Sequence, residues 1–447
     1  MKLVYGVKDR PKFGQMLVFA FQQLLAILAA TIAVPAIIGN GMSASAALFG
    51  AGVGTLVYQL FTKFRSPVFL GSSFAFIGSM FAAFGGAASA AAGYAGLIIG
   101  AASAGLVYVI IALVVKFVGV KWINKLMPAV VIGPTVAIIG LSLAGNAVGD
   151  LFKGKVLDAA GNSLANPYLC LVCGLVTLFT VIICSVFGKK MAKLIPFIIG
   201  ILAGYVVALI ITVIGVMTED VTLQIINLEA FKGMTIFAIP DFTFLTAFSG
   251  IGDITGEYVA TVVVAYIPVA FVVFAEHIAD HKNLSSIIES DLLEEPGLHR
   301  TLLGDGVGSM AGAFFGGCPN TTYGESVGCV AITGNASVVT ILTTAVMAIA
   351  IAFFGPFVTF LGSIPNCVMG GVCITLYGFI AVSGLKMLQK VDLNENKNLF
   401  VAAVILICGI GGLTVTFGKV TITSIACALI LGIITNVIVS KKKTDAE

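Results

Sequence analysis

The sequence predicts an all-α polytopic membrane protein with 14 transmembrane segments arranged as two inverted repeats of seven spans. Its 447 residues are 59% hydrophobic and only 10% charged, with a mean hydropathy of +1.10, whereas soluble domains carry about 25% charged residues. The apolar residues form separate runs close to the length of a membrane span, and the basic residues gather on one side of those runs. The 52 glycines suit helices that pack closely in a bilayer.

The hydropathy pattern marks fourteen candidate spans. The first is too long for the apolar core of a signal peptide, so we expect it to be retained. The set is 15–38, 43–62, 67–84, 93–117, 126–147, 167–187, 194–216, 256–281, 301–316, 319–335, 337–361, 365–385, 398–417 and 420–440. The third and tenth segments, which begin at Pro67 and Pro319, fall short of the roughly 20 residues that a spanning helix needs.

The basic residues test this span count independently. With an even number of spans and a cytoplasmic N-terminus, only four of the 24 Lys and Arg residues fall outside: Lys153, Lys155, Lys232 and Lys419. The other 20 fall inside, as the positive-inside rule requires. We therefore expect a multi-pass protein of the cytoplasmic membrane with both termini in the cytoplasm. The polar stretch 218–248 is expected to be an outside loop, with an interfacial helix around residues 222–231.

The span arithmetic indicates an inverted repeat. Seven spans precede the outside loop and seven follow it, so the second half enters the membrane from the opposite side. The sequence at 127–133 is echoed at 364–370, in the fifth and twelfth spans. In the third and tenth segments, small hydroxyl residues and an aromatic follow the proline. We expect an extended stretch and then a short helix in each, because paired interrupted segments mark transporter binding sites; the alternative is surface loops with re-entrant tails.

Glu325 is a carboxylate in apolar sequence, because no Lys or Arg occurs between Arg300 and Lys386. An ionised carboxylate at bilayer depth costs several kcal/mol or more. Such residues usually face a cavity and mark a path for substrate or protons. Glu325 is therefore the first candidate for a functional residue.

Three further acids lie in apolar segments. Glu276 and Asp280 are four residues apart, so a helix places both carboxyl groups on one face. The alternative for Glu276 is that the helix reaches water there and the charge snorkels. Asp305, early in the ninth span, is expected to be an interfacial or structural hydrogen-bonding group. Asp253 and Glu257 lie near the outer start of the eighth span and are expected to be solvated.

The sequence does not predict an enzyme. It contains no nucleophile and base pair, no metal-ligand cluster and no cofactor loop, so catalytic residues, metals and cofactors are not expected. The nine cysteines all lie in apolar segments. Cys170 and Cys173 form the one Cys-x-x-Cys pair, but they lack the flanking ligands of a metal site, and we expect all nine to be small packing residues.

Four motifs carry a resemblance to a known family: residues 71–76 (GSSFAF), 275–277 (AEH), 296–300 (PGLHR) and 319–325 (PNTTYGE). Over nearly its full length the chain resembles the nucleobase-ascorbate transporter family, and within it the bacterial uracil permeases. The family signature is an acidic or amide residue, Asn, any residue, Gly, four residues and Thr. It begins here at Glu325 and ends at Thr333, with Ser326 in place of the usual Asn.

The resemblance implies a core domain that holds substrate and a gate domain against which it moves. The core would comprise residues 1–120 and 251–362 (spans 1–4 and 8–11), and the gate residues 121–250 and 363–447 (spans 5–7 and 12–14). Carried over residue by residue, the carboxylates of Glu276 and Glu325 would accept hydrogen bonds from the N–H groups of uracil. Backbone N–H groups at Phe74 and near Gly324 and Glu325 would donate to its carbonyl oxygens. Ala30 and Tyr323 would line the pocket. Asp280, with Glu276, is implied in proton coupling.

The expected function is therefore proton-coupled uracil import by alternating access. Carboxylates and helix N-termini complement the two N–H donors and two carbonyl acceptors of uracil. The absence of Lys and Arg from the embedded segments argues against an anionic substrate. Because burial disfavours the charged form of a carboxyl group, proton exchange at Glu276, Asp280 or Glu325 is expected. A purine-base permease of the xanthine type is the runner-up, and an anion exchanger of related fold a weaker alternative. The expected partners are a nucleobase, a proton and the lipid bilayer, without nucleic acid; the sequence allows a homodimer.

Overall fold

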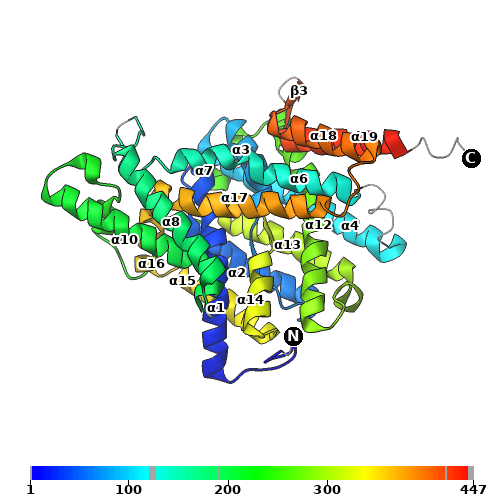
Figure 1. Cartoon of the computed structure of the whole chain (residues 1–447), viewed down its shortest axis with the longest axis horizontal. Coiled ribbons are helices and arrows are strands. Elements are labelled where there is room, and N and C mark those ends of the chain that lie inside the picture. The colour runs from blue at the N-terminus through cyan, green and yellow to red at the C-terminus, as the bar shows by residue number, and fades with distance from the viewer. Residues whose placement is uncertain (1–2, 120–126, 159, 190, 418–419, 441–447) are drawn as a thin grey trace, which may run out of the picture.

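The computed structural model describes residues 3–119, 127–158, 160–189, 191–417 and 420–440 (Figure 1). The predicted boundary between core and gate at residues 120 and 121 lies outside these ranges, as do the C-terminal lysines 441–443 that contribute to the predicted orientation. Within the described residues the chain is mostly helical, as predicted.

The helices follow the predicted spans, with several interruptions. In the first half they are α1 (Phe13–Ile38), α2 (Ala44–Phe61), α3 (Ile77–Gly85), α4 (Ala90–Val118), α6 (Ala129–Ser142), α7 (Ala144–Asp150), α8 (Pro167–Phe187), α9 (Met191–Leu194) and α10 (Pro196–Met217). In the second half they are α11 (Thr243–Ser249), α12 (Gly256–Ile288), α13 (Leu298–Gly316), α14 (Gly324–Thr333), α15 (Val338–Ile351), α16 (Gly355–Ser363), α17 (Asn366–Leu388), α18 (Asn396–Ile410) and α19 (Ser424–Ser440).

Eight segments of the described chain are long and apolar enough to cross a membrane. They are α1, α2, α4, α6 with α7, α8, α10, α12 and α17. The other six predicted spans correspond to shorter, interrupted or less apolar helices: α3, α13, α14, α15 with α16, α18 and α19. The chain is therefore a multi-pass membrane protein, while the count of fourteen spans and their inverted repeat stay predictions.

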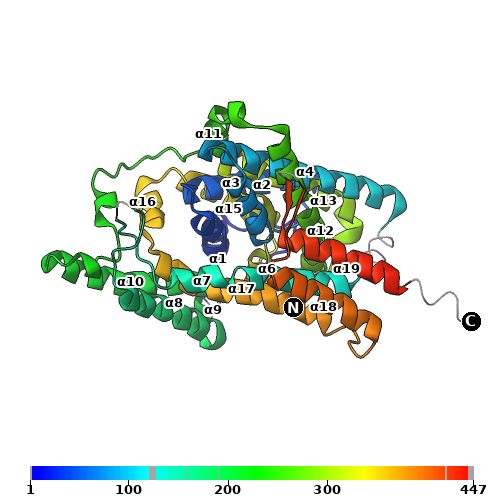
Figure 2. The ribbon, with the colours of Figure 1, turned by 90° about the horizontal axis from the view of Figure 1, so that it is seen from above.

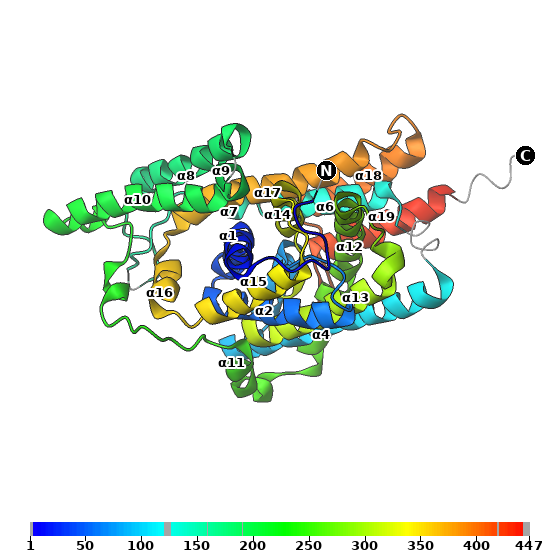
Figure 3. The same ribbon diagram turned by 90° about the horizontal axis from the view of Figure 1, so that it is seen from below.

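The helices form two groups that lie side by side (Figures 2 and 3). In the first, here called the core group, α2 packs on α13 and α15, and α4 packs on α12 and α13. In the second, the gate group, α17 packs on α6 and α8, and α18 packs on α6 and α19. Small residues allow the close approach within the core group: a Cβ atom on Gly54 would lie 2.7 Å from the carbonyl oxygen of Gly308, as expected where helices associate through small residues.

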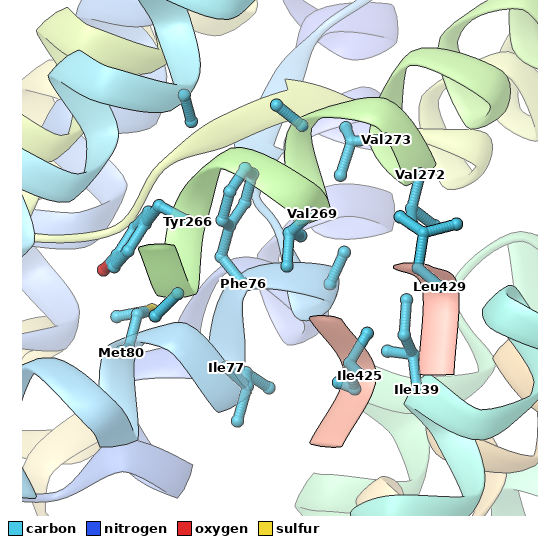
Figure 4. Close-up of a cluster of buried hydrophobic side chains, with 14 of the residues drawn as sticks. Phe76, Ile77, Met80, Ile139, Tyr266, Val269, Val272, Val273, Ile425 and Leu429 are labelled. Atoms are coloured by element: carbon cyan, nitrogen blue, oxygen red, sulfur yellow. The ribbon is translucent and has the colours of Figure 1, made fainter. Parts of the chain in front are cut away.

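The two groups meet through an apolar contact (Figure 4). On the core side of this contact, Tyr266 of α12 stacks on Phe76, which precedes α3, with ring centroids 5.4 Å apart. The surrounding buried side chains come from α3, α12, α6 and α19, and include Ile77, Met80, Val269, Val272, Val273, Ile139, Ile425 and Leu429. Apolar contacts are non-directional, so this surface binds the groups together without fixing one hydrogen-bonded register.

Two short strands interrupt the third and tenth predicted spans. Strand β1 (Leu70–Ser72) pairs antiparallel with β2 (Asn320–Thr322), and Gly71 lies opposite Thr321. The predicted extended stretch followed by a short helix is confirmed in both segments. Gly71 is required by close packing, because a side chain there would overlap the ring of Tyr323. The strand pair is buried, which is where non-helical backbone is tolerated at membrane depth.

Two details differ from the sequence predictions. The thirteenth and fourteenth spans were predicted to meet at residues 417 and 420, but a hairpin of β3 (Val415–Phe417) and β4 (Val420–Ile422) lies there, because alternating Val and Thr favour strand over helix. The interfacial helix predicted around residues 222–231 is wrong. Two 3₁₀ turns, Val221–Leu223 and Leu228–Phe231, occupy that stretch, with Asp220 and Asn227 capping them.

Candidate substrate site

The strand pair sets the positions of two short helix starts. A 3₁₀ turn, Phe74–Phe76, follows β1 and leads into α3, and α14 begins at Gly324 directly after β2 and Tyr323. Because the strands are antiparallel, the two starts flank the pair at opposite ends. The first N–H groups of a helix have no intrahelical acceptor, so each start offers donors, and a positive dipole end, to a ligand beside the strands.

A cavity of about 250 Å³ lies beside this strand pair, between the core and gate groups. The core group contributes residues 73–75, four positions on α12 (Ala275, Glu276, Ala279 and Asp280) and residues 321–325. The gate group closes the opposite wall with apolar side chains and one hydroxyl, from Val136, Leu376, Phe379, Ile380, Ser383 and Met387. Its volume is just below the roughly 300–1,000 Å³ of sites for drug-sized ligands, which suits a small heterocycle.

Three carboxyl groups reach the cavity. Glu276 and Asp280 lie one turn apart on the same face of α12, and Glu325 lies in the first turn of α14. All three residues are partly exposed. No Lys or Arg in the described chain lines the cavity. The site can therefore accept several hydrogen bonds but has no cation for an anionic ligand.

Local contacts orient these acids. The hydroxyl of Thr322 donates a 3.0 Å hydrogen bond to Oδ2 of Asp280, tying α12 to β2. Glu325 lies in the first turn of α14, directly after Gly324. Tyr323 is buried, and its hydroxyl donates to the carbonyl oxygen of Ser72 at 2.8 Å. Its ring thus forms part of the wall, while its hydroxyl is used within the protein.

Six of the seven residues singled out for substrate or proton binding line this cavity: Glu276, Glu325, Phe74, Gly324, Tyr323 and Asp280. Ala30 does not. It is 1% exposed and packs in the apolar cluster that also contains Tyr323. The structure therefore places Ala30 among buried apolar residues rather than in the cavity wall. The roles of these residues in binding stay predictions.

Ser326, the departure from the family signature, forms two hydrogen bonds. Its hydroxyl oxygen accepts from Nε2 of Gln23 at 2.5 Å and from the backbone N–H of Phe69 at 2.9 Å. Ser326 is fully buried. One short side chain therefore joins α1, the segment before β1 and the first turn of α14, and supports the neighbouring Glu325.

The sequence analysis did not predict a polar network on the other side of α12. His277 is fully buried, with Nδ1 2.8 Å from Oδ2 of Asp305 and Nε2 2.9 Å from the hydroxyl of Thr301. One turn on, Nε2 of His281 lies 2.7 Å from the hydroxyl of Tyr58. The signal was present in the spacing, because histidines four residues apart share one helix face. Asp305, expected to be interfacial or structural, is 1% exposed and hydrogen-bonded.

Comparison with known proteins identifies the family. The model of the xanthine–uracil permeases, described as "Permease family", matches residues 14–418. The chain belongs to the nucleobase-ascorbate transporter family. Among curated members of this permease family, it is 40% identical to the uracil permease of Bacillus caldolyticus, over 100% of this chain and 97% of the relative. It is 33% identical to the uracil permease of Escherichia coli K12, over 96% and 92% of the two chains. Its relatives are thus transporters and not enzymes.

Solved structures of more distant transporters share the fold of this permease. The transmembrane domain of the cyanobacterial bicarbonate transporter BicA is 16% identical with a TM-score of 0.58, over 96% of this chain and 99% of that one. The murine anion transporter Slc26a9, in its inward-facing state, is 12% identical with a TM-score of 0.66, over 98% and 70% of the chains. At these identities the likeness concerns the fold alone.

Proposed function

We propose that this permease imports uracil together with a proton by alternating access. One observation carries the proposal: a small cavity between the two helix groups holds three carboxyl groups and two helix starts but, among the described residues, no basic side chain. The similarity to uracil permeases over the whole chain supports uracil as the substrate.

The hydrogen-bonding groups of the cavity complement those of uracil. In this proposal the carboxylates of Glu276 and Glu325 accept the two ring N–H groups, and such charge-assisted hydrogen bonds are about twice as strong as neutral ones. The backbone N–H groups at Phe74 and Gly324 donate to the carbonyl oxygens. The apolar gate wall, including Leu376 and Ile380, covers the ring face. An anion such as bicarbonate would meet three carboxyl groups without a balancing cation. This arrangement disfavours anion exchange, the alternative that the likeness in fold to anion transporters would suggest.

Asp280 is the proposed site of the coupling proton. It lies on the cavity wall one turn from Glu276, and its hydrogen bond from Thr322 connects it to the strand beside the substrate. Protonation of Asp280 would remove one of three like charges and so favour the ionised state of the two carboxylates that bind uracil. The proton and uracil would then bind with positive coupling, as symport requires.

Movement between the two helix groups would expose the cavity to each side of the membrane in turn. The substrate ligands come from the core group and the opposite wall from the gate group. The apolar contact of Figure 4, around Phe76 and Tyr266, offers a surface over which the groups can slide. We propose that the core carries uracil past the gate.

Uptake of labelled uracil into liposomes containing the purified protein tests this proposal. Unlabelled uracil should compete with the label, whereas xanthine and bicarbonate should compete far less. Competition by xanthine with no effect of uracil would instead support a purine-base permease. Chloride or bicarbonate flux without uracil uptake would support anion exchange and overturn the proposal.

A further inference from the structure

A second, much smaller cavity lies on the far side of strand β2. Its volume is about 10 Å³, and its polar lining comes from Tyr108 on α4, Asp305 and Ser309 on α13, and Asn320 and Thr321 on β2. A void of roughly 10–15 Å³ holds one water-sized occupant. Thr321 also lines the substrate cavity, so a single strand separates the two spaces.

Unpartnered oxygen atoms are concentrated in this void. Among the described residues, six buried side-chain atoms have no hydrogen-bond partner, and three of them belong to the void: Tyr108 Oη, Asp305 Oδ1 and Asn320 Oδ1. Each of these three residues is at most 4% exposed. A buried polar atom without a partner costs about 1–3 kcal/mol. Three such atoms around one void indicate an occupant.

The orientation of two of these groups is fixed from outside the void. Nδ2 of Asn320 donates to the carbonyl oxygen of Gly50 at 3.1 Å, which leaves its Oδ1 for the void. Oδ2 of Asp305 lies 2.8 Å from Nδ1 of His277, which leaves Oδ1. Both orphaned oxygen atoms are acceptors, so neither can satisfy the other, and the hydroxyl of Tyr108 has one hydrogen atom to donate to one of them. At least one acceptor is left for the occupant, which must present positive charge or a hydrogen atom to it.

Charge balance favours a cation over water. Asp305 has no Lys or Arg within ion-pair distance in the described chain, and its one ionic contact is His277. The hydroxyl of Thr301 lies within reach of both the carbonyl oxygen of Leu298, at 3.0 Å, and Nε2 of His277, at 2.9 Å. When it donates to Nε2, the imidazole is neutral and its Nδ1–H donates to Asp305. In that arrangement, with Asp305 ionised, the pair retains one negative charge at membrane depth, which a cation balances and a water molecule does not.

We propose that this void binds one sodium ion. The donors are one carboxylate oxygen, the amide oxygen of Asn320 and the hydroxyl oxygens of Tyr108 and Ser309, and hard oxygen donors of this kind suit alkali and alkaline-earth ions. A single carboxylate balances a monovalent ion, whereas calcium sites commonly use several. The void has no room for an ion that keeps its water shell, and sodium is smaller than a water molecule. Potassium, which is about as large as water, fits less well.

Occupancy of this void would stabilise the substrate site. The ion would tie α4 and α13 to β2, and β2 presents Thr321 and Thr322 to the substrate cavity. Sodium is thereby expected to raise the affinity for the substrate. The ion site itself does not depend on uracil being that substrate.

Thermal unfolding of the purified full-length protein tests the proposal in equal concentrations of sodium, potassium or N-methylglucamine chloride. A ligand that binds only the folded state raises Tm with its concentration. We expect a saturable rise in sodium that is much smaller in potassium and absent in N-methylglucamine. Asp305→Asn should abolish the sodium-dependent rise, while Asp241→Asn, at an exposed carboxylate outside the void, should retain it.

Ser309→Ala provides a second test that changes no charge, in case Asp305→Asn does not fold. The substitution removes one of the proposed oxygen donors. Loss of even an outer-shell partner commonly weakens metal binding roughly 10–100-fold, so the half-maximal sodium concentration should rise by at least about tenfold. Equal Tm values of the unsubstituted protein in sodium and N-methylglucamine would show that water alone fills the void and would overturn the proposal. An unchanged sodium response in both variants would also overturn it. Uracil uptake in sodium-free medium reports on the proposed function separately.

Discussion

Glu325→Gln is the substitution that perturbs the proposed uracil site most specifically. Glu325 lies in the first turn of α14 on the cavity wall and forms no ion pair in the described chain. The amide has nearly the same shape, so the strand pair and the short helix should be retained. What changes is one acceptor, from a charged oxygen to a neutral one.

The size of the effect follows from that change. Hydrogen bonds to charged groups contribute about 1.5–3 kcal/mol and neutral ones about 0.5–1.5 kcal/mol, so the exchange removes about 1–1.5 kcal/mol, which corresponds to roughly 5- to 12-fold in a dissociation constant. We therefore expect uracil to bind Glu325→Gln roughly 5- to 12-fold more weakly, with little change in Tm. Replacement of a charged acceptor at bilayer depth should not destabilise the fold, because the carboxylate has no cationic partner to lose.

Binding of labelled uracil to the purified variants measures this difference. Glu294→Gln, at an exposed acid that does not line the cavity, is a matched control that should bind as the unsubstituted protein does. Size-exclusion profiles and Tm values check that each variant is folded. An unchanged dissociation constant for a folded Glu325→Gln would refute the assignment of Glu325 as a uracil ligand.

Three further predictions concern groups around the cavity. Asp280→Asn should retain uracil binding but lose accumulation driven by a proton gradient, as measured by equilibrium binding and by uptake into liposomes; equal loss of both would indicate a structural role. Ser326→Ala removes the acceptor of two buried hydrogen bonds, each worth about 0.5–1.5 kcal/mol, so denaturant unfolding should reveal a loss of about 1–3 kcal/mol, and Ser326→Thr should preserve most of the stability. Gly71→Ala should displace the Tyr323 ring and weaken uracil binding more than Gly145→Ala, at a position with open space around it; equal binding by the two variants would contradict the proposed role of the strand pair.

Much of the site was predictable because membrane depth restricts which residues are tolerated. Acids in apolar sequence are costly, so Glu276, Asp280 and Glu325 stood out without any knowledge of the fold. The prolines and hydroxyl residues of the third and tenth segments indicated broken helices, and β1 and β2 confirm that expectation. Each of these features depends only on residues that are close together in the sequence, so the sequence alone is enough to predict it.

Features that depend on packing between distant segments were not predictable. Ala30 was expected in the pocket, but the rotation of α1 turns it into a buried apolar cluster. The contact between His277 and Asp305 joins residues 28 positions apart on separate helices, and no periodicity specifies their meeting. The support of Ser326 by Gln23 spans 303 positions. In each case the contact depends on how one helix is rotated about its axis and how closely another helix packs against it, and neither is specified by the sequence of a single helix.

Proton movement driven by uracil tests the central claim most directly. Purified protein in liposomes with a trapped pH-sensitive dye should acidify the lumen when uracil, but not xanthine, is added outside, and Asp280→Asn liposomes should not respond. Uracil accumulation with no change in luminal pH, or no response to uracil in liposomes that contain folded protein, would contradict proton-coupled uracil import.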